Sequence, residues 1–483
     1  MFRLLPLVIF LQLITSCAVN PVTGKKQFAV MSEAKEIAMG QAYDPQITAS
    51  FGLYEDSVLQ NYINAMGKEM GAISHRPKLN YTFRIMDSPV VNAFAVPGGY
   101  VYFTRGIMAN FNNEAEFAGV LGHEIGHVTA RHSVVAQRNA VMAQVGLIAG
   151  MIASPKFAEY LEPASTGVQL MLLKFGRDAE SQSDGLGVEY SSRIGYNAHE
   201  MAEFFNTLSR QGGGSASRIP EFLSTHPDPL NRLENVHELA TAWQEKLNLS
   251  DGKVGRDTYL RMLEGLVYGE DPRQGFVENS AFVHPELKIQ FPVPNGWKHE
   301  NTPQQFSMAP ADGKALLFLA FAPGVTLQAA SDTMARQYGL TVLTRNSRVI
   351  NGFDALEMNA EQRQEAAPDQ QQTAQMLKVK VTLYKVGESV LQITGVTEGT
   401  DLNTYQGEFT RTMIGFAPLT DILLLNKQPE RLHVQRTDHA ASLSQQLTKY
   451  GIPHDKLEEF AIVNGMELTD DIPSGTLIKV LKR

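Results

Sequence analysis

The segment His123-Glu124-Ile125-Gly126-His127 constrains this chain most, because it places three ionisable side chains inside an apolar run. Residues four positions apart lie almost above one another on an α-helix, so His123 and His127 share one edge. Two imidazoles placed in this way can reach one metal ion, with Zn–N distances of about 2.0–2.1 Å. Glu124 points off that edge and can hold a water molecule rather than the metal.

The flanking residues predict a buried helix. Asn113 followed by Glu116 is the signature of a capped helix start. Three glycines, Gly119, Gly122 and Gly126, each cost about 1 kcal/mol in a helix interior, so we expect another backbone or a substrate to approach closely. The alternative, an exposed helix with ordinary polar residues, does not explain the apolar stripe at helical spacing. That stripe consists of Phe117, Val120, Leu121, Ile125 and Val128. The pattern therefore favours an H-E-x-x-H site, two ligands and a general base, as in zinc peptidases.

A catalytic zinc ion takes three protein ligands, and the candidate for the third is Glu180, at the head of a second predicted helix. Asp184 follows one turn later on the same face, where it can accept a hydrogen bond from a ligand histidine. Arg177, one turn earlier, could neutralise the surplus negative charge. The alternative interpretation of this segment is a solvated, charged helix start.

A strand over 81–86 and two further β segments in Asn92–Phe103, joined by a Pro-Gly-Gly turn, are predicted next. An edge strand beside a metal site can pair with an extended substrate backbone, which makes Asn92 and Phe94 candidate substrate-binding residues. An ordinary hairpin packed on the helix is the alternative.

The N-terminus has the pattern of a secretory signal peptide over residues 1–16, too short to span a membrane. Cys17 is the single cysteine, so no intrachain disulfide can form. Leu13-Ile14-Thr15-Ser16-Cys17 resembles the bacterial lipobox, which implies a lipidated Cys17 as the mature N-terminus. Ala18 after it implies the outer membrane. The alternative is an ordinary cleaved signal and a soluble periplasmic protein.

After the N-terminal anchor, the composition and length of the chain are those of a globular protein of two to four domains. A formal net charge of −9 argues against a nucleic-acid partner. No later segment has the length of a membrane span, and the nearest, residues 140–153, is predicted to be a buried helix of the catalytic domain.

In this order and spacing, the motifs resemble the HtpX/CAAX-prenyl-protease-like family of H-E-x-x-H zinc metallopeptidases, and more closely its periplasmic lipoprotein members. The resemblance covers about residues 17–245. It implies His123, His127 and Glu180 as ligands of one zinc ion per chain, Glu124 as catalytic base and Asp184 as a supporting residue. The chain departs from the family pattern at Gly176, Gln182 and Ser183, where Ser, Glu and Ala are usual; this leaves the ligands in place.

Ser224-Thr225-His226-Pro227 follows a glycine-rich stretch at 212–214, and Ser-Thr-His-Pro also recurs in this family close to the active site. His226 either stabilises the oxyanion, or occupies the metal's open position and keeps the enzyme latent, or is a helix-entry histidine without a role. Arg232 either binds substrate carbonyls or pairs with Glu234.

We predict an α+β fold class in three domains after a lipidated tether at 17–33. The first, residues 34–265, is a mainly helical, gluzincin-like zinc metallopeptidase domain with a small edge sheet. The second, residues 281–420, is an α+β sandwich-like accessory domain. The third, residues 430–483, reads strand, helix, helix, strand. Residues 246–280 are predicted to be a helical spacer, and 359–375 a polar loop.

Two further resemblances concern these C-terminal domains. The stretch from Phe282 to Trp297 is similar to small single-sheet domains of the PsbP/Mog type. Asn464-Gly465 and Pro473–Ile478 resemble the second half of a LysM module, which implies binding to N-acetylglucosamine chains of peptidoglycan. The first half departs, because Arg436-Thr437-Asp438 stands where Gly-Asp-Thr is usual.

The sequence therefore predicts a zinc-dependent endopeptidase of the bacterial cell envelope that cleaves misfolded or misassembled envelope proteins. It would sit on the periplasmic side of the outer membrane, contact the membrane only through a lipid anchor, and reach peptidoglycan through residues 430–483. The alternative is a non-catalytic envelope scaffold or assembly factor that binds peptidoglycan and partner proteins. Glu124 argues against a scaffold, because a closed structural zinc site needs no base. A glycan hydrolase would require two carboxylates flanking a sugar cleft, and the sequence shows no evident pair of this kind.

Overall fold

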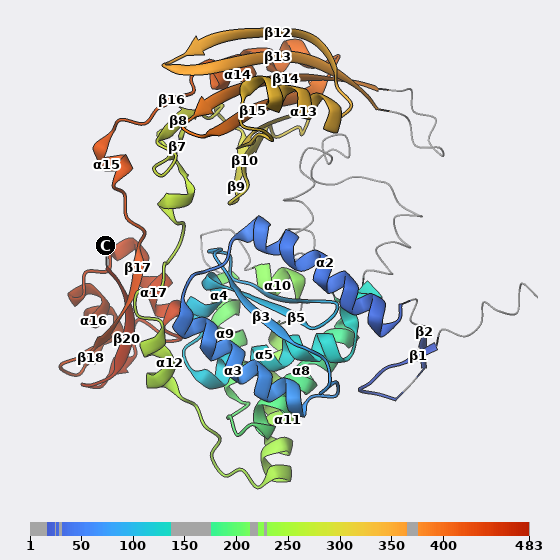
Figure 1. The fold of residues 1–483 in the computed structure, drawn as a ribbon. Helices are drawn as coiled ribbons and strands as arrows, with labels where there is room; N and C mark the ends of the chain where they lie inside the picture. Colours follow the sequence, from blue (N-terminus) through green and yellow to red (C-terminus); the bar gives the residue numbers. More distant parts are fainter. Residues whose placement is uncertain are drawn as a thin grey trace, which may run out of the picture.

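The computed structural model describes residues 17–24, 26–28, 31–136, 175–212, 221–226, 229–364 and 375–482. The predicted signal peptide, the apolar helix at 140–153 and residues 213–214 of the glycine-rich stretch lie outside these ranges. Figure 1 shows a helical domain, a large sheet and a small C-terminal module. Across the described ranges, we find no helix with both the length and the apolar character needed to cross a bilayer.

The helical domain surrounds a three-stranded sheet of order β3-β5-β4, in which β3 and β5 are parallel and β4 is an antiparallel edge strand. The strands are β3 (Thr82–Met86), β4 (Ala93–Val96) and β5 (Tyr100–Thr104). The helices are α2 (Glu33–Phe51), α3 (Ser57–Ile73), α4 (Arg105–Asn110), α5 (Glu114–Thr129), α8 (Arg177–Arg193), α9 (Glu200–Gly212), α10 (Glu221–Thr225), α11 (Pro229–Leu247) and α12 (Arg256–Met262). The predicted edge sheet and its turn are therefore present.

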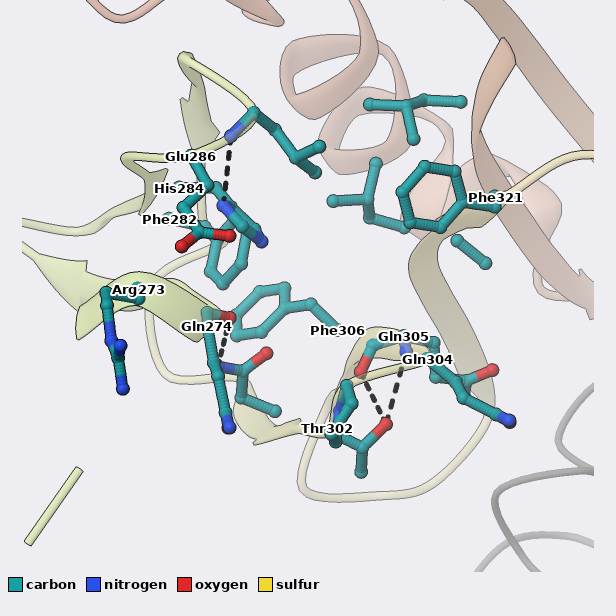
Figure 2. A pocket seen from close by; sticks show the side chains of 16 residues that line it. Arg273, Gln274, Phe282, His284, Glu286, Thr302, Gln304, Gln305, Phe306 and Phe321 are labelled. Atoms are coloured by element: carbon teal, nitrogen blue, oxygen red, sulfur yellow. Dashed lines mark hydrogen bonds between the residues drawn. The ribbon is translucent and has the colours of Figure 1, made fainter. Parts of the chain in front are cut away.

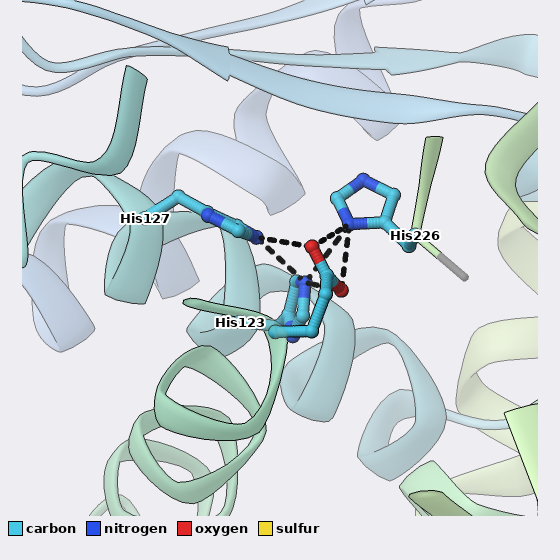
Figure 3. Close-up of side chains that lie close together, drawn as sticks. His123, His127 and His226 are labelled. Carbon is cyan, nitrogen blue, oxygen red and sulfur yellow. Dashed lines mark hydrogen bonds and ion pairs between the residues drawn. The ribbon is translucent and has the colours of Figure 1, made fainter. Parts of the chain in front are cut away.

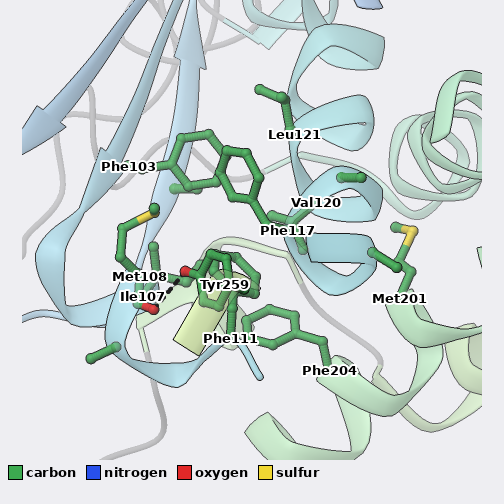
Figure 4. Packing of buried hydrophobic residues seen from close by; sticks show 14 of the residues in the cluster. Phe103, Ile107, Met108, Phe111, Phe117, Val120, Leu121, Met201, Phe204 and Tyr259 are labelled. Atoms are coloured by element: carbon green, nitrogen blue, oxygen red, sulfur yellow. Dashed lines mark hydrogen bonds between the residues drawn. The ribbon is translucent and has the colours of Figure 1, made fainter. Parts of the chain in front are cut away.

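Helix α5 carries the H-E-x-x-H segment, and every one of its residues is buried. The Asn113 side chain caps it by accepting a hydrogen bond from Glu116 N at 2.8 Å. A Cβ at Gly122 would come within 3.0 Å of Gly187 Cα, so the close approach that the glycines predicted is made by the backbone of α8. Figure 4 shows the aromatic core beside α5, with Phe103, Phe117 and Tyr259 contributed by three different elements.

The accessory domain contains a seven-stranded antiparallel sheet of order β12-β13-β14-β15-β11-β10-β9 and a four-stranded sheet of order β16-β8-β7-β6. Buried apolar clusters lie on both faces of the large sheet, one including residues of α13 and the other residues of α14. The elements of the large sheet are β9 (Lys298–Asn301), β10 (Gln305–Ala309), β11 (Ala315–Phe321), β12 (Thr341–Ile350), β13 (Phe353–Gln364), β14 (Gln375–Val386) and β15 (Ser389–Glu398). The remainder are β6 (Phe276–Glu278), β7 (Ala281–His284), β8 (Ile289–Pro292), β16 (Ala417–Pro418), α13 (Leu327–Gln337) and α14 (Leu402–Ile414).

Two predictions about individual segments are wrong, one between the first two domains and one inside the accessory domain. Residues 246–280 are not a helical spacer, because α12 places Tyr259 and Leu260 fully inside the core of the helical domain. The polar loop predicted at 359–375 begins too early, because β13 continues to Gln364. Residues 365–374 lie outside the described ranges.

The C-terminal module has the predicted order of strand, helix, helix and strand, with β17 and β20 paired antiparallel. Its elements are β17 (Arg431–Arg436), β18 (Ala441–Ser442), α16 (Leu443–Lys449), α17 (Leu457–Val463), β19 (Asp471–Ile472) and β20 (Leu477–Lys482). Its apolar residues belong to the same buried cluster as those of the helical domain. The module is therefore docked on that domain.

Lys479 is central to this docking. Its Nζ is fully buried and donates hydrogen bonds to Ala109 O at 2.9 Å and Phe111 O at 3.0 Å, at the end of α4. Arg210 of α9 donates to Met466 O at 3.0 Å. The loop after α17, part of which suggested LysM, thus contacts the helical domain, and the LysM resemblance itself is not confirmed.

Candidate metal centre

Four buried side chains from three segments meet at one site: His123 and His127 from α5, Glu180 from α8, and His226 just after α10. One potential ligand atom from each lies within 4.8 Å of the others. Figure 3 shows the three imidazoles converging on one carboxylate. The predicted ligands and His226 are therefore brought together.

The donor atoms are closely spaced. His123 Nε2 lies 3.0 Å from His127 Nε2 and 3.3 Å from His226 Nδ1. The Glu180 carboxylate lies 3.6 Å from His123 Nε2 and 3.5 Å from His127 Nε2. Burial alone would raise the pKa of Glu180, but the histidines and Arg232 around it lower that pKa below its usual value. The carboxylate is thus held in the anionic form that a metal ligand needs.

Asp184 contacts His123 on the side away from the cluster. Its Oδ1 lies 2.9 Å from His123 Nδ1, so the aspartate accepts the Nδ1 proton and leaves the lone pair of Nε2 facing the cluster. Burial opposes ionisation of Asp184, yet the Arg232 guanidinium and the His123 hydrogen bond hold its pKa at about 2.

Arg232 forms a two-pronged ion pair with Asp184, through Nη2 at 2.6 Å and Nε at 2.8 Å. Its Nη1 lies 3.4 Å from Glu180 Oε2. Arg232 therefore pairs with Asp184 and Glu180, not with Glu234, which was the partner suggested by the sequence. Arg177, in contrast, is exposed at the first position of α8, so Arg232 supplies the neutralising charge expected from Arg177.

Glu124 is fully buried, and neither of its carboxylate oxygens has a hydrogen-bond partner among the residues that the structure describes. Its Oε1 lies 3.8 Å from His226 Nε2, which is beyond hydrogen-bond distance. Burial raises the pKa of this carboxyl group above its usual value. A buried carboxyl group without a hydrogen-bond partner is costly, so its presence here points to a chemical task.

The edge-strand candidates Asn92 and Phe94 are both buried. Phe94 is buried and stacks on Tyr102, with ring centroids 4.9 Å apart, in a cluster that includes residues of α2. The side chains of its neighbours Ala93 and Ala95 instead belong to the core that includes α5. Asn92 is fully buried just before β4, and its N–H donates to Thr104 Oγ1 at 3.2 Å. The Phe94 side chain therefore packs on the α2 side of the sheet, away from the helix that carries the histidines.

Two polar neighbours of the centre were not predicted. His132 Nδ1 lies 3.0 Å from His127 Nδ1, and His132 Nε2 lies 2.9 Å from Gln182 Oε1. The only signal in the sequence was a third histidine shortly after His127.

A metal ion fits this set of residues. Two imidazole Nε2 atoms 3.0 Å apart, a carboxylate and a third imidazole are the donors that zinc prefers, and an unpaired carboxylate stands beside them. Without a metal ion, buried imidazole lone pairs that face one another would lack hydrogen-bond donors.

The model of peptidase family M48 matches residues 57–240, which contain all four donors. The chain carries a peptidase family M48 domain. This confirms the predicted zinc metallopeptidase domain, and zinc is the metal that M48 metallopeptidases use.

Two relatives are each similar to slightly less than half of this chain. A protein of Yersinia pestis named beta-barrel assembly-enhancing protease is 33% identical over 228 residues, covering 46% of this chain and 47% of that protein. Mitochondrial metalloendopeptidase OMA1 of Arabidopsis thaliana is 28% identical over 238 residues, covering 47% of each. The chain thus spans about half the length of these curated relatives.

Among solved structures, cyanobacterial PsbP from Synechocystis is similar to 30% of this chain and 91% of its own, at 10% identity and a TM-score of 0.22. That score is too low to support an argument about fold, so the PsbP/Mog resemblance stays a prediction.

Proposed function

We propose that this protein is a zinc-dependent endopeptidase of the bacterial cell envelope. The observation that carries the proposal is the Glu124 carboxylate, buried without a hydrogen-bond partner in the described part of the chain and adjacent to three imidazoles and Glu180. A structural metal site has no use for such a group. A hydrolytic site needs it as the base.

In the proposed reaction, His123, His127 and Glu180 would hold zinc, which when bound would lower the pKa of water toward ~7 and polarise the scissile carbonyl. Glu124 accepts the proton of the attacking water and delivers it to the leaving amine. Burial raises the pKa of Glu124, which is the direction that favours uptake of the proton from water before its delivery to the amine.

The outer edge of β4 is the proposed contact for an extended peptide substrate. This strand pairs only with β5 among the described strands. On its other edge Ala95 O accepts a hydrogen bond from Ser133 Oγ at 2.8 Å, so a substrate backbone would replace or share this contact. We therefore assign substrate binding here to the β4 backbone, with Asn92 placed at its start and Phe94 fixing the strand on α2.

We further propose that His226 occupies a fourth ligand position and keeps the site latent. Its Nδ1 reaches both the Glu180 carboxylate and His123 Nε2. The residues on either side of 221–226, namely 213–220 and 227–228, are outside the described ranges, so the proposal rests on the imidazole position alone.

The envelope assignment draws on the name of the Yersinia relative and on the N-terminal motif. We propose lipid attachment at Cys17 on the periplasmic side of the outer membrane, with misfolded or misassembled envelope proteins as substrates.

Cys17 lies in β1 (Cys17–Val19), paired with β2 (Lys26–Phe28). Replacing Cys17 with serine should abolish labelling by radioactive palmitate and release the protein from membranes. Peptidoglycan binding through residues 430–483 is retained as a separate proposal.

The experiment replaces the native protein in cells with Glu124→Gln and compares envelope proteomes with those of the native and deletion strains. Accumulation of the same envelope proteins in the variant and deletion strains supports an endopeptidase. If the deletion causes accumulation and Glu124→Gln does not, the protein acts as the scaffold of the alternative prediction. The proteins that accumulate identify the substrates.

A further inference from the structure

His132 is a buried histidine beside the metal centre that the proposed hydrolysis does not use. Only 7% of its surface is exposed. Its Nδ1 faces His127 Nδ1 at 3.0 Å and Ser183 Oγ at 3.2 Å, and its Nε2 faces Gln182 Oε1 at 2.9 Å. Both ring nitrogens are therefore engaged, one by a predicted zinc ligand.

The backbone places His132 there at a conformational cost. The chain turns directly after α5 at Arg131, whose φ of 62° is the left-handed conformation that non-glycine residues avoid. Arg131 is held in this turn by Glu36 Oε2, 2.9 Å from its Nε, and by Met31 O, 2.7 Å from its Nη2. Arg76 pairs with the same Glu36 carboxylate at 2.8 Å. A turn supported by two arginines and a buried glutamate indicates a residue whose position matters.

The hydrogen bonds determine where the protons lie. A carboxamide oxygen only accepts, so His132 Nε2 carries a proton and donates it to Gln182. His132 Nδ1 then has a lone pair, and His127 Nδ1, 3.0 Å away, must be the donor. His127 Nε2 is left with its lone pair directed at the cluster, as a zinc ligand requires.

We propose that His132 and Gln182 are positioning residues: they set the tautomer and ring orientation of His127 and so tune the affinity of the centre for zinc. The proposal rests on the zinc site proposed above. The two ligand histidines are supported unequally, because His123 donates to the Asp184 carboxylate while the chain from His127 ends in the neutral Gln182 amide. A carboxylate in place of that amide would make His127 the stronger donor.

Zinc affinity is measured on the full-length protein without substrate, by competition with a chromophoric chelator. His132→Ala should weaken zinc binding by about 10–100-fold, the usual effect of losing a partner of a ligand histidine, and Gln182→Ala should weaken it less. Gln182→Glu should tighten it. The matched control is Ser181→Glu, which adds the same charge one position away at an exposed site of α8. Circular dichroism of the metal-free variants checks that they fold.

The absorption spectrum of the cobalt-substituted protein gives a second readout, because it responds to the ligand field and not to packing. We expect the bands to shift in His132→Ala and Gln182→Glu and to stay in place in Ser181→Glu. Wild-type zinc affinity in both alanine variants would overturn the proposal, as would equal shifts for Gln182→Glu and Ser181→Glu. A protein that follows the predicted order of affinities but cleaves no peptide bond would overturn the proposed function alone.

Discussion

His226 Nδ1 lies 3.1 Å from each carboxylate oxygen of Glu180, so one imidazole contacts both ligating atoms of the predicted third zinc ligand. His226 is held there by its ring contact with Phe222, with centroids 4.5 Å apart, and by Arg232, which donates to its carbonyl oxygen at 3.2 Å. Because Arg232 also pairs with Asp184, the residue that orients His123 is linked to the segment that carries His226.

His226→Ala tests whether this imidazole blocks the site. Removing a fourth ligand should raise basal cleavage of a general unfolded substrate or leave it unchanged. The measurement is the rate of proteolysis by zinc-loaded protein, together with its zinc content. A fall of ~10²–10³ in rate with zinc still bound would instead make His226 an oxyanion-stabilising residue.

Lys479→Met tests the docking of the C-terminal module. The change leaves the buried carbonyl oxygens of Ala109 and Phe111 without their Nζ donor, so the free energy of unfolding should fall by about 1–3 kcal/mol. Lys482→Met, at the exposed end of the same strand, is the matched control. Equal stability of the two variants in urea denaturation would show that the Lys479 contacts contribute nothing to docking.

His284 should make the accessory domain sensitive to mild acid. It lines a cavity of about 260 Å³ with Phe282 and Phe306 (Figure 2), and burial lowers its pKa to about 4. The unfolded chain, with an ordinary histidine pKa of about 6.5, therefore binds a proton more readily than the folded one. The stability contribution is complete above pH 6.5 and is lost as the pH falls toward 4, a loss of about 2 kcal/mol between pH 7 and pH 5.

Denaturation at these two pH values, followed by Trp297 fluorescence in a Trp243→Phe background, measures this loss. His284→Asn keeps an acceptor for the Leu287 N–H, which lies 3.3 Å from His284 Nδ1, but does not titrate. That variant should lose most of the pH dependence, whereas the exposed His299→Asn should keep it. The explanation fails if both variants follow the wild type.

The parts of the centre that were predictable are those in which helical periodicity places residues on one face. His123 with His127 and Glu180 with Asp184 are each four positions apart, so their order along the chain implies their proximity. The ion pair of Arg232 with Asp184 joins two helices, and nothing local marks it. His132 escaped prediction because its position depends on the left-handed conformation of Arg131, a residue type that gives no sign of a turn.

Tertiary context also decided the fold where local signals misled. The polar residues at the end of β13 resemble a loop, yet Met358, Ala360 and Gln362 alternate inward and are buried by the sheet. Helix α12 reaches the core through Leu260 and Tyr259, and the Tyr259 ring packs on Phe117 in the aromatic cluster beside α5. The strand order of the C-terminal module was predictable, but its docking was not, because the Lys479 contacts involve residues some 370 positions apart.

The most direct test of the account is the comparison of Glu124→Gln with wild type and Glu180→Ala in zinc content and in cleavage of an unfolded protein. Glutamine preserves the volume of the side chain but cannot take a proton, so Glu124→Gln should retain stoichiometric zinc and lose most of its turnover. Glu180→Ala should lose zinc and activity together. Wild-type cleavage by Glu124→Gln would contradict the assignment of Glu124 as the base and with it the proposed mechanism.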